Sequence, residues 1–326
     1  MSTIDVGPWL RSLPQEGGFA CISSARAFAH DEAAYDRQYA NDPANFAVGR
    51  GLLRLLDRRG APTDKPAVEI GCGTGLVSLG LAEKSPYPLT LLTDPSPAFL
   101  RITQRKVSSQ GIDQARVAYG VLMGEEIDRL PAGGFSLVVL RSTLHHVLDV
   151  DGFIRDAGRA LAPGGILTFQ EPCMEGYVLM GAVAQFLTPL AAAAGRPLSA
   201  VQSAKVDEFA RTMAFYSRRD VDKTQAEDKH LFRVDELMCS ARRSGMELEF
   251  LANVEYNQWA EDESRTPTPV GFTLFFRNYA KYCMSWDETL MARFDELLTP
   301  YCRIVEESSG GGSGPYLHGV FVARKA

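Results

Sequence analysis

The feature that most constrains this chain is a glycine-rich turn between an apolar run and an amphipathic run. In AVEIGCGTGLVSLGLAEK, residues 67–84, glycines occupy positions 71, 73 and 75. Such a turn from a strand into a helix leaves room for a ligand to contact main-chain N–H groups at the positive end of the helix. The stretch therefore predicts a strand, a turn and a helix that together bind a nucleotide-like ligand.

From this turn onward, short apolar segments alternate with helical patterns. The alternation is typical of βαβ units and predicts an α/β fold with a doubly wound, mostly parallel sheet of the Rossmann-like type. Seven strands are expected, at residues 67–70, 89–93, 116–119, 135–140, 165–171, 248–256 and 316–324.

The rest of the chain is expected to be mainly helical. Residues 1–60 have helical spacing and predict an N-terminal helical cap in front of the ligand-binding core. The segment after Pro172 has apolar helical patterns without a strand, which predicts a helical lid inserted over the substrate site. Apolar helices at 177–194 and 270–284 fit either a pocket wall or the surface of a homodimer. The expected regions are the cap 1–60, the core 61–172, the lid 173–230, and a remainder of the core with a helical insertion, 231–326.

Composition and charge narrow the class of protein. The formal net charge of −6 argues against a large nucleic-acid surface, which needs many Lys and Arg on one face. Six cysteines contain no C-x-x-C pair, so neither a disulfide framework nor a zinc knuckle is indicated. Asp5, Pro8 and Pro14 interrupt the region where a signal peptide would be apolar, and no unbroken run of about 18 apolar residues occurs. We therefore expect a cytoplasmic protein with no membrane and no nucleic-acid partner.

Two carboxylates refine the expected ligand. Asp94 ends the second strand, nineteen residues after Gly75, where a doubly wound fold presents a carboxylate to a ribose. Glu69 lies two residues before the first glycine of the turn, where its charge would repel a pyrophosphate but attract an ammonium group. Together they favour a nucleoside that carries an amino acid over a dinucleotide.

In the region 67–172 the sequence resembles a known family, the class I S-adenosylmethionine-dependent methyltransferases, in particular those that act on small molecules. Four segments resemble the motifs of that family in the family's order, and the ending GPYLHGVFVARK resembles its antiparallel last strand. The segments are VEIGCGTG, LLTDPSPAFL, FSLVVLRSTLHHVLD and RALAPGGILTFQEP. The resemblance implies S-adenosyl-L-methionine as cofactor and S-adenosyl-L-homocysteine as product.

The resemblance also implies cofactor contacts at the matching positions. It implies that the glycine turn lines the methionine moiety and the sugar. It also implies that Glu69 faces the amine, that Asp94 holds the ribose hydroxyls and that Pro95 lies beside the adenine. These residues are Gly71, Cys72, Gly73 and Gly75 in the turn, Glu69, Asp94 and Pro95.

The third motif departs from the family pattern. Where relatives usually have an Asp near the end of the third strand, this chain reads GVLMGEEIDRLP, residues 120–131. We expect backbone amides and the apolar side chain of Met123 to contact the adenine instead. Arg141, just beyond the fourth strand, is expected to contact cofactor or substrate, or to pair with a surface acid. Tyr35 resembles aromatic residues that close over the cofactor, with core packing as the alternative.

The candidates for catalysis follow the fourth and fifth strands. His145 or His146 has the chemistry to remove the substrate proton, because the pKa of histidine lies near neutrality; capping of the next helix is the alternative role. Glu171 ends the fifth strand, where it could orient a substrate hydroxyl or ammonium, or initiate the turn at Pro172. No set of metal ligands is indicated by spacing along the chain.

The reaction expected is direct displacement, in which a small-molecule acceptor attacks the methyl carbon, with oxygen preferred over nitrogen or carbon. Alignment and exclusion of water are the main tasks of the protein. Three alternatives stay open: a non-catalytic cofactor-binding protein of the same fold, a nucleic-acid methyltransferase and an NAD-dependent oxidoreductase.

Overall fold

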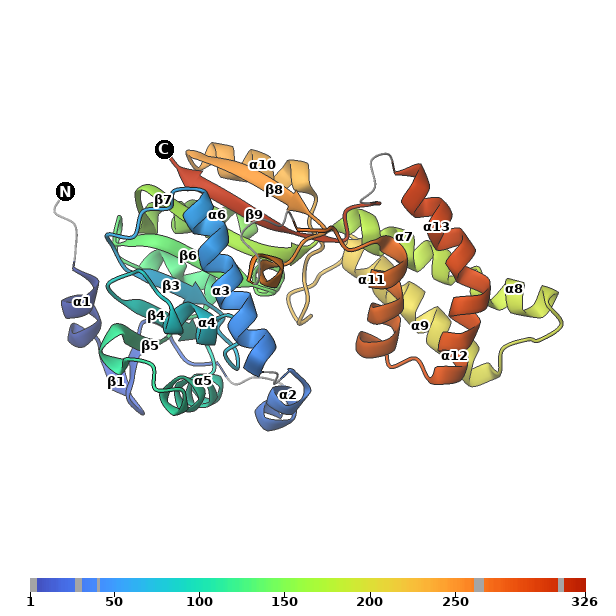
Figure 1. Ribbon diagram of the computed structural model, residues 1–326, viewed down its shortest axis with the longest axis horizontal. Helices are drawn as coiled ribbons and strands as arrows, with labels where there is room; N and C mark the ends of the chain where they lie inside the picture. The colour runs from blue at the N-terminus through green and yellow to red at the C-terminus, as the bar shows by residue number, and fades with distance from the viewer. Residues whose placement is uncertain (1–4, 27–30, 40–41, 261–266, 310–313) are drawn as a thin grey trace.

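The computed structural model describes residues 5–26, 31–39, 42–260, 267–309 and 314–326 (Figure 1). Its centre is a sheet of nine strands in the order β1-β2-β5-β4-β3-β6-β7-β9-β8. The neighbours from β2 to β7 run parallel, whereas β1, β9 and β8 are each paired antiparallel. The strands are β1 Gln15–Glu16, β2 Phe19–Cys21, β3 Ala67–Ile70, β4 Thr90–Asp94, β5 Val117–Val121, β6 Phe135–Arg141, β7 Leu161–Pro172, β8 Met246–Ala252 and β9 His318–Lys325.

The predicted α/β sheet is confirmed, with two more strands than expected. The additional pair, β1 and β2, lies in the region predicted to be a helical cap. Gly17 and Gly18 have φ values of 60° and 88°, which suit the tight turn between two short strands. Strand β2 then extends the sheet beside β5, and Phe19 is fully buried there.

Helices cover both faces of the sheet, and each face has its own apolar core. Helices α1 (Val6–Ser12), α6 (Val150–Ala160) and α10 (Val234–Arg243) pack on one face, through side chains such as Phe153 and Leu237. The other face is covered by α3 (Asp42–Arg58), α4 (Ser78–Glu83), α5 (Pro97–Ser109) and the 3₁₀ turn η4 (Tyr256–Trp259). The remaining elements of this part are α2 (Glu32–Tyr39), η1 (Gln114–Arg116), η2 (Gly124–Arg129) and η3 (Leu144–His146).

A separate group of helices lies beyond the ends of β7 and β9 (Figure 1). We call it the helical subdomain. It combines the predicted insertion after Pro172 with the later helical stretch, and a shared core that includes Phe209, Phe276 and Phe294 holds the two together. Its helices are α7 Met174–Ala184, α8 Leu187–Ala193, α9 Ala200–Ser217, α11 Phe272–Asn278, η5 Tyr279–Cys283, α12 Glu288–Arg293, η6 Phe294–Leu298 and α13 Thr299–Ser308.

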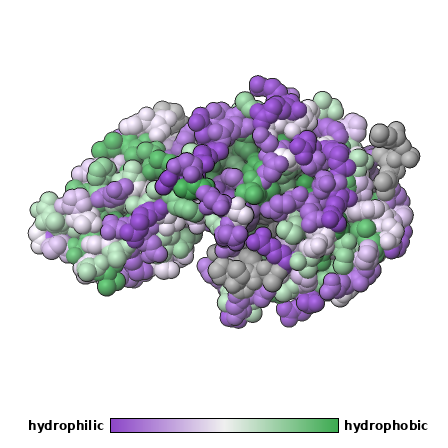
Figure 2. Space-filling view, turned by 180° about the vertical axis from the view of Figure 1, so that it is seen from behind, coloured by the Kyte–Doolittle hydropathy of each residue, from purple (hydrophilic) through white to green (hydrophobic). Residues whose placement is uncertain are grey.

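The helical subdomain carries much of the exposed apolar surface (Figure 2). Val201, Tyr282, Ile304 and Leu274 each expose more than half of their area. Within the described residues, the stretch Met174–Ala193 is long and apolar enough to cross a membrane by length and composition. That is weak evidence for a span, since 44% of its apolar window is buried in the protein.

Candidate active site

A cavity of about 270 Å³ lies at the carboxyl ends of the parallel strands β3, β4, β5 and β6. Open α/β sheets bind their ligands in this crevice. The loops after the four strands form one side, and Tyr35 of α2 and the segment 225–229 contribute further walls. Seven of the predicted site residues line it: Tyr35, Gly71, Gly73, Asp94, Pro95, Met123 and His146.

The glycine turn reaches the cavity because its glycines adopt left-handed conformations. Gly71, Gly73 and Gly75 have φ values of 70°, 52° and 96°, which side chains disfavour. A Cβ atom on Gly71 would also lie 2.5 Å from Thr143 Cγ2, so the turn after β3 packs tightly on the loop after β6. Among the described residues, no heavy atom lies within 4 Å of the Cβ position on Gly73, so a ligand can approach the backbone there.

Asp94 is held in place by the turn. Its carboxylate accepts hydrogen bonds from the N–H of Gly73 at 2.9 Å and from the N–H of Ser96 at 2.8 Å. Burial raises the pKa of Asp94 to about 6, against the opposing effect of these two backbone bonds. A carboxylate has about four acceptor positions, so Asp94 keeps capacity for hydroxyl donors in the cavity.

The side chains of Glu69, before the turn, and Cys72, within it, are buried and do not line the cavity. The hydroxyl of Ser78 donates to Glu69 at 2.7 Å, and burial raises the pKa of Glu69 to about 8. Burial also raises the pKa of the Cys72 thiol well above its ordinary value. The thiol is therefore kept protonated and is no nucleophile. Gly75 faces Thr103 rather than the cavity.

Two of the backbone amides at the third motif already have partners within the protein. Met123 lines the cavity, but its N–H already donates to the hydroxyl of Ser23 at 2.8 Å. The N–H of Leu122 likewise donates to the carbonyl of Asp94 at 3.3 Å. The amides of Leu122 and Met123 are therefore occupied. The next two residues, Gly124 and Glu125, also line the cavity, so a contact of backbone amides with the adenine stays a prediction. Tyr35 packs on Phe99 with ring centroids 5.3 Å apart.

Glu171 fixes the loop that follows β6. One of its carboxylate oxygens accepts from the N–H of Thr143 at 2.8 Å and from the N–H of Leu144 at 2.6 Å. The other lies 2.6 Å from Nδ1 of His145. The side chain of Glu171 is fully buried, so its hydrogen-bond partners are groups of the protein itself. Glu171 thus holds a loop and does not face the cavity.

His145 and His146 have opposite electrostatic surroundings. Burial alone would lower the pKa of His145, but the carboxylates of Glu171 and Asp228 outweigh it and raise that pKa to about 10. His145 is therefore a cation that donates from both ring nitrogens. Burial and the neighbouring charge of His145 lower the pKa of His146.

The tautomer of His146 follows from its partner. Nδ1 of His146 lies 2.9 Å from the carbonyl oxygen of Glu227, which can only accept. Nδ1 therefore carries the proton, and Nε2 keeps a lone pair. Because His146 is neutral and lines the cavity, it can accept a proton, whereas His145 cannot.

Asp228 is a residue that the sequence analysis missed. Its Oδ1 lies 3.4 Å from Nε2 of His145 and 3.4 Å from Nδ1 of His146. It lies in the segment between α9 and α10, and no spacing along the chain connects it to the histidines. The three residues place ligand atoms within 4.8 Å of one another, a group that could hold a metal ion. A protonated His145 between the carboxylates of Glu171 and Asp228 accounts for this group of residues without a metal ion.

Arg141 does not itself line the cavity. Its guanidinium lies 4.0 Å from the carboxylate of Glu255, on the face of the sheet covered by η4. Its Nε is buried and has no hydrogen-bond partner among the described residues.

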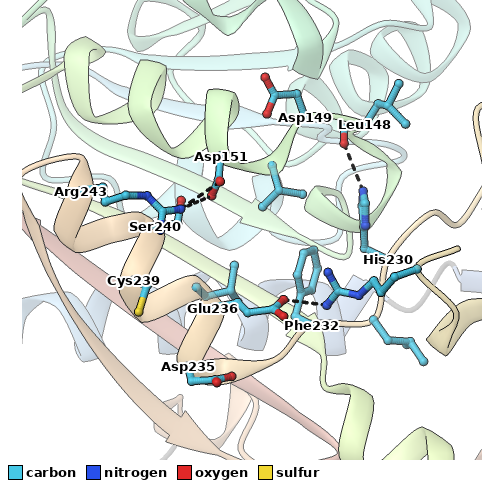
Figure 3. Close-up of a pocket in the computed structure, with 14 residues that line it drawn as sticks. Leu148, Asp149, Asp151, His230, Phe232, Asp235, Glu236, Cys239, Ser240 and Arg243 are labelled. Atoms are coloured by element: carbon cyan, nitrogen blue, oxygen red, sulfur yellow. Dashed lines mark hydrogen bonds and ion pairs between the residues drawn. The ribbon is translucent and has the colours of Figure 1, made fainter.

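A second cavity, of about 470 Å³, lies between the start of α6 and α10 (Figure 3). Its charged groups are paired across the opening: Arg243 with Asp151 at 2.9 Å and Arg219 with Glu236 at 2.7 Å. His230 lies 3.3 Å from the carbonyl of Leu148. None of the predicted site residues lines this cavity.

Comparison with protein families decides the class. Residues 35–224 match the model of a methyltransferase domain, which is more than half of the chain. The chain belongs to this methyltransferase family. The family uses S-adenosylmethionine, so the cavity at the glycine turn lies where the family's cofactor is expected.

Curated relatives of this chain are similar to it over part of their length. A ubiquinone biosynthesis O-methyltransferase of Methylocella silvestris is 30% identical over 138 residues, which cover 39% of this chain and 51% of that protein. An uncharacterised methyltransferase of Emericella nidulans is 29% identical over 161 residues, 44% of this chain and 49% of that protein. The chain thus spans about half the length of these relatives.

A solved structure supports the fold. A Galdieria sulphuraria protein assigned as a sarcosine dimethylglycine methyltransferase superposes with a TM-score of 0.52 at 10% identity, over 90% of this chain and 98% of that chain. At this identity the similarity shows a common fold and carries no information on the acceptor.

Proposed function

We propose that this methyltransferase transfers the methyl group of S-adenosylmethionine to an oxygen atom of a small molecule, with His146 as the general base. The observation that carries the proposal is the difference between the two adjacent histidines. His145 is a cation fixed by Glu171 and Asp228, whereas His146 lines the cavity as a neutral imidazole with a free Nε2 lone pair. A neutral base suits an acceptor that must lose a proton.

The cofactor-binding roles are proposed for the residues around the glycine turn. Asp94 would accept hydrogen bonds from the ribose hydroxyls with its remaining lone pairs. Gly73 would let the methionine moiety approach the backbone, with Gly71 lining the cavity beside it, and Glu69 would act on the ammonium group of that moiety from behind the turn. Pro95, Met123 and Tyr35 would surround the adenine and ribose, since all three line the cavity.

In the proposed mechanism, the bound cofactor supplies a methyl group that is already activated on a sulfonium, and S-adenosylhomocysteine is the product. The residues of this chain align the acceptor oxygen with that methyl group. Nε2 of His146 takes the proton from the acceptor. Glu171 and His145 act as positioning residues, because they fix the loop that carries His146. Segment 225–229 would exclude water as a lid.

A small acceptor is favoured over a nucleic acid by charge. The net charge of −6 and the ion pairs of Arg218, Arg219 and Arg233 with nearby acids leave no basic surface on the segment between α9 and α10. The cavity is also formed largely by loops at the ends of the strands, together with Tyr35 and residues of the segment 225–229. A protein that binds the cofactor without catalysis would need no neutral histidine such as His146 in the cavity.

The first experiment tests the cofactor site by calorimetry. We expect wild-type protein to bind S-adenosylhomocysteine, and Asp94→Ala to bind it at least about tenfold more weakly, since charge-assisted hydrogen bonds are the strong ones. Asp113→Ala is the matched control, because Asp113 caps the short helix η1 away from the cavity. Equal affinity of D94A and wild type would contradict the site.

The second experiment tests the base. Production of S-adenosylhomocysteine is measured with a panel of phenols, aliphatic alcohols and hydroxy acids. We expect His146→Gln to lose about 10²- to 10⁴-fold in kcat while retaining cofactor affinity. His230→Gln, in the second cavity, is the control and should keep full activity. An unchanged kcat in H146Q would overturn its role as base.

We also propose that the exposed apolar side chains of the helical subdomain contact a second copy of the chain. Helices predicted as pocket wall or dimer surface expose Val178, Phe186, Leu274 and Tyr282 while burying Tyr177 and Phe276. Light scattering coupled to size-exclusion chromatography should give the mass of a homodimer, and a monomer mass would contradict this.

A further inference from the structure

Three charged or polar side chains converge where the sheet meets the helical subdomain. The guanidinium of Arg141 lies 4.0 Å from one carboxylate oxygen of Glu255, and Nε2 of His318 lies 3.9 Å from the other. Both distances are too long for direct hydrogen bonds. Glu255 therefore stands between the two groups without satisfying either of them.

The hydrogen-bonding groups of Arg141 and His318 are left unused. Nε of Arg141 and both ring nitrogens of His318 are buried and have no partner among the described residues. The side chain of His318 is only 7% exposed. Buried polar groups in native proteins are almost always paired, so two unpaired groups at one place indicate a missing partner.

The position of this pair relates it to the candidate active site. Arg141 ends β6 and is followed directly by Ser142 and Thr143, which line the cavity. His318 begins β9 and is paired with Pro172 at the end of β7. The two residues thus share the edge of the sheet at which His146 and Glu171 lie.

The helical subdomain places an aromatic ring against His318, and a second ring against the first. Phe275 of α11 stacks on His318 with centroids 5.1 Å apart and an interplanar angle of 27°. Tyr177 of α7 contacts Phe275 with centroids 6.0 Å apart. A ligand group that reached Arg141 and His318 would therefore carry its apolar part against aromatic side chains.

We propose that Arg141 and His318 bind a carboxylate of the methyl acceptor, so that the substrate class is a carboxylic acid with a separate hydroxyl group. The proposal rests on the proposed function and names a part of its acceptor site. One carboxylate oxygen would accept from Nε of Arg141 and the other from the ring N–H of His318. Glu255 would orient both donors from the opposite side.

Charge favours a carboxylate over a phosphate in this place. Arg141 and Glu255 neutralise each other, and burial lowers the pKa of His318 to about 4, with Glu255 opposing this and Arg141 adding to it. A dianionic phosphate would therefore bring two uncompensated charges into a buried region. A carboxylate brings one, which protonation of His318 can balance.

The experiment uses benzoate and its neutral isostere benzamide as probes of the full-length protein. The ring signals of His318 are followed by ¹H–¹³C NMR with and without S-adenosylhomocysteine, and are assigned by their loss in His318→Gln. We expect benzoate to shift these signals, and benzamide to bind at least about tenfold more weakly. Arg141→Gln should weaken benzoate binding at least about tenfold, whereas Arg141→Lys, which keeps the charge, should weaken it less. Arg155→Gln, at an exposed ion pair, is the matched control.

The outcomes separate this proposal from the proposed function. Equal binding of both probes, or an unchanged affinity for benzoate in R141Q, would overturn the carboxylate site and indicate that ordered water fills the gap. A loss of S-adenosylhomocysteine affinity of tenfold or more in R141Q would also overturn it, because Arg141 would then contact the cofactor. If wild-type protein binds no S-adenosylhomocysteine but benzoate still shifts His318 in an Arg141-dependent way, the methyl-transfer proposal fails and the carboxylate site stands.

Discussion

The side chain of Thr143 lies against the Cα atom of Gly71, so close that a methyl group on Gly71 would come within 2.5 Å of Thr143 Cγ2. This contact joins the turn after β3 to the loop after β6, which carries the two histidines. The contact between the side chain of Thr143 and the backbone of Gly71 therefore fixes the glycine turn relative to the histidine loop. A change at Gly71 should affect both of them.

We expect Gly71→Ala to destabilise the protein by about 2–5 kcal/mol. The left-handed conformation contributes about 1–2 kcal/mol and the steric overlap about 1–3 kcal/mol. Gly111→Ala is the matched control, since Gly111 has a φ of 68° but no atom near its Cβ position. Urea unfolding should show a loss of only about 1–2 kcal/mol for G111A. Similar losses for both variants would contradict the importance of the contact with Thr143.

Glu171→Gln should destabilise the protein by about 3–5 kcal/mol, because it removes the charge that compensates buried His145. The pH dependence follows from the raised pKa of His145. This stabilisation is fully present below the ordinary histidine pKa of 6.5 and is lost as pH rises towards about 10. Thermal unfolding from pH 6 to 10 should therefore show a decline in wild type that is much smaller in E171Q. Parallel curves would contradict a charged His145.

Cofactor binding should release a proton from Glu69. Burial raises the pKa of Glu69 to about 8, so its carboxyl group is mostly protonated at pH 7 in the free protein. The ammonium and sulfonium charges of the cofactor favour the ionised form, so affinity should rise from pH 6 to 8 with release of up to about one proton. Calorimetry at pH 7 in buffers of different ionisation enthalpy measures the number of protons released on binding. Glu69→Gln should abolish the release, and a buffer-independent heat in wild type would show that Glu69 does not respond to the ligand.

Asp228→Asn should shorten the residence of the cofactor. Asp228 joins segment 225–229, which walls the cavity, to His145 on the core. The side chain of Asp228 is 39% exposed, so solvent screening limits its contribution to about 1 kcal/mol or less. Stopped-flow displacement of S-adenosylhomocysteine should be accelerated up to about fivefold. Asp222→Asn, at an exposed residue that also lies between α9 and α10 but outside 225–229, should leave the rate unchanged.

Most of the sheet could be predicted because apolar runs and the glycine turn are local signals. The boundaries were less accurate where tertiary contacts decide them. Strand β7 begins at Leu161, four residues earlier than expected, because it extends through Pro163 and Gly164 with a register irregularity against β6. Strand β8 ends at Ala252, since Asn253 adopts a φ of 54° and Tyr256 starts a 3₁₀ turn. The hairpin of β1 and β2 was missed because its strands are only two and three residues long.

The candidate site could be predicted as far as residues lie next to strand ends. Asp94, Met123 and His146 line the cavity as their positions after the strands suggested. Asp228 could not be found, because its contact with His145 joins segments more than eighty residues apart. The different states of His145 and His146 depend on Glu171, Asp228 and the carbonyl of Glu227, and no pattern in the sequence distinguishes the two rings. Their roles in catalysis stay a prediction.

The chain passes between the sheet and the helical subdomain four times, after β7, before α10, after β8 and before β9. Pairing of Pro172 with His318, of Ala252 with Gly319 and of Cys173 with Phe232 shows that all these passages meet at one edge of the sheet. Because all four connections lie at this edge, the subdomain can diverge in evolution while the strands that carry Gly71 and Asp94 stay unchanged.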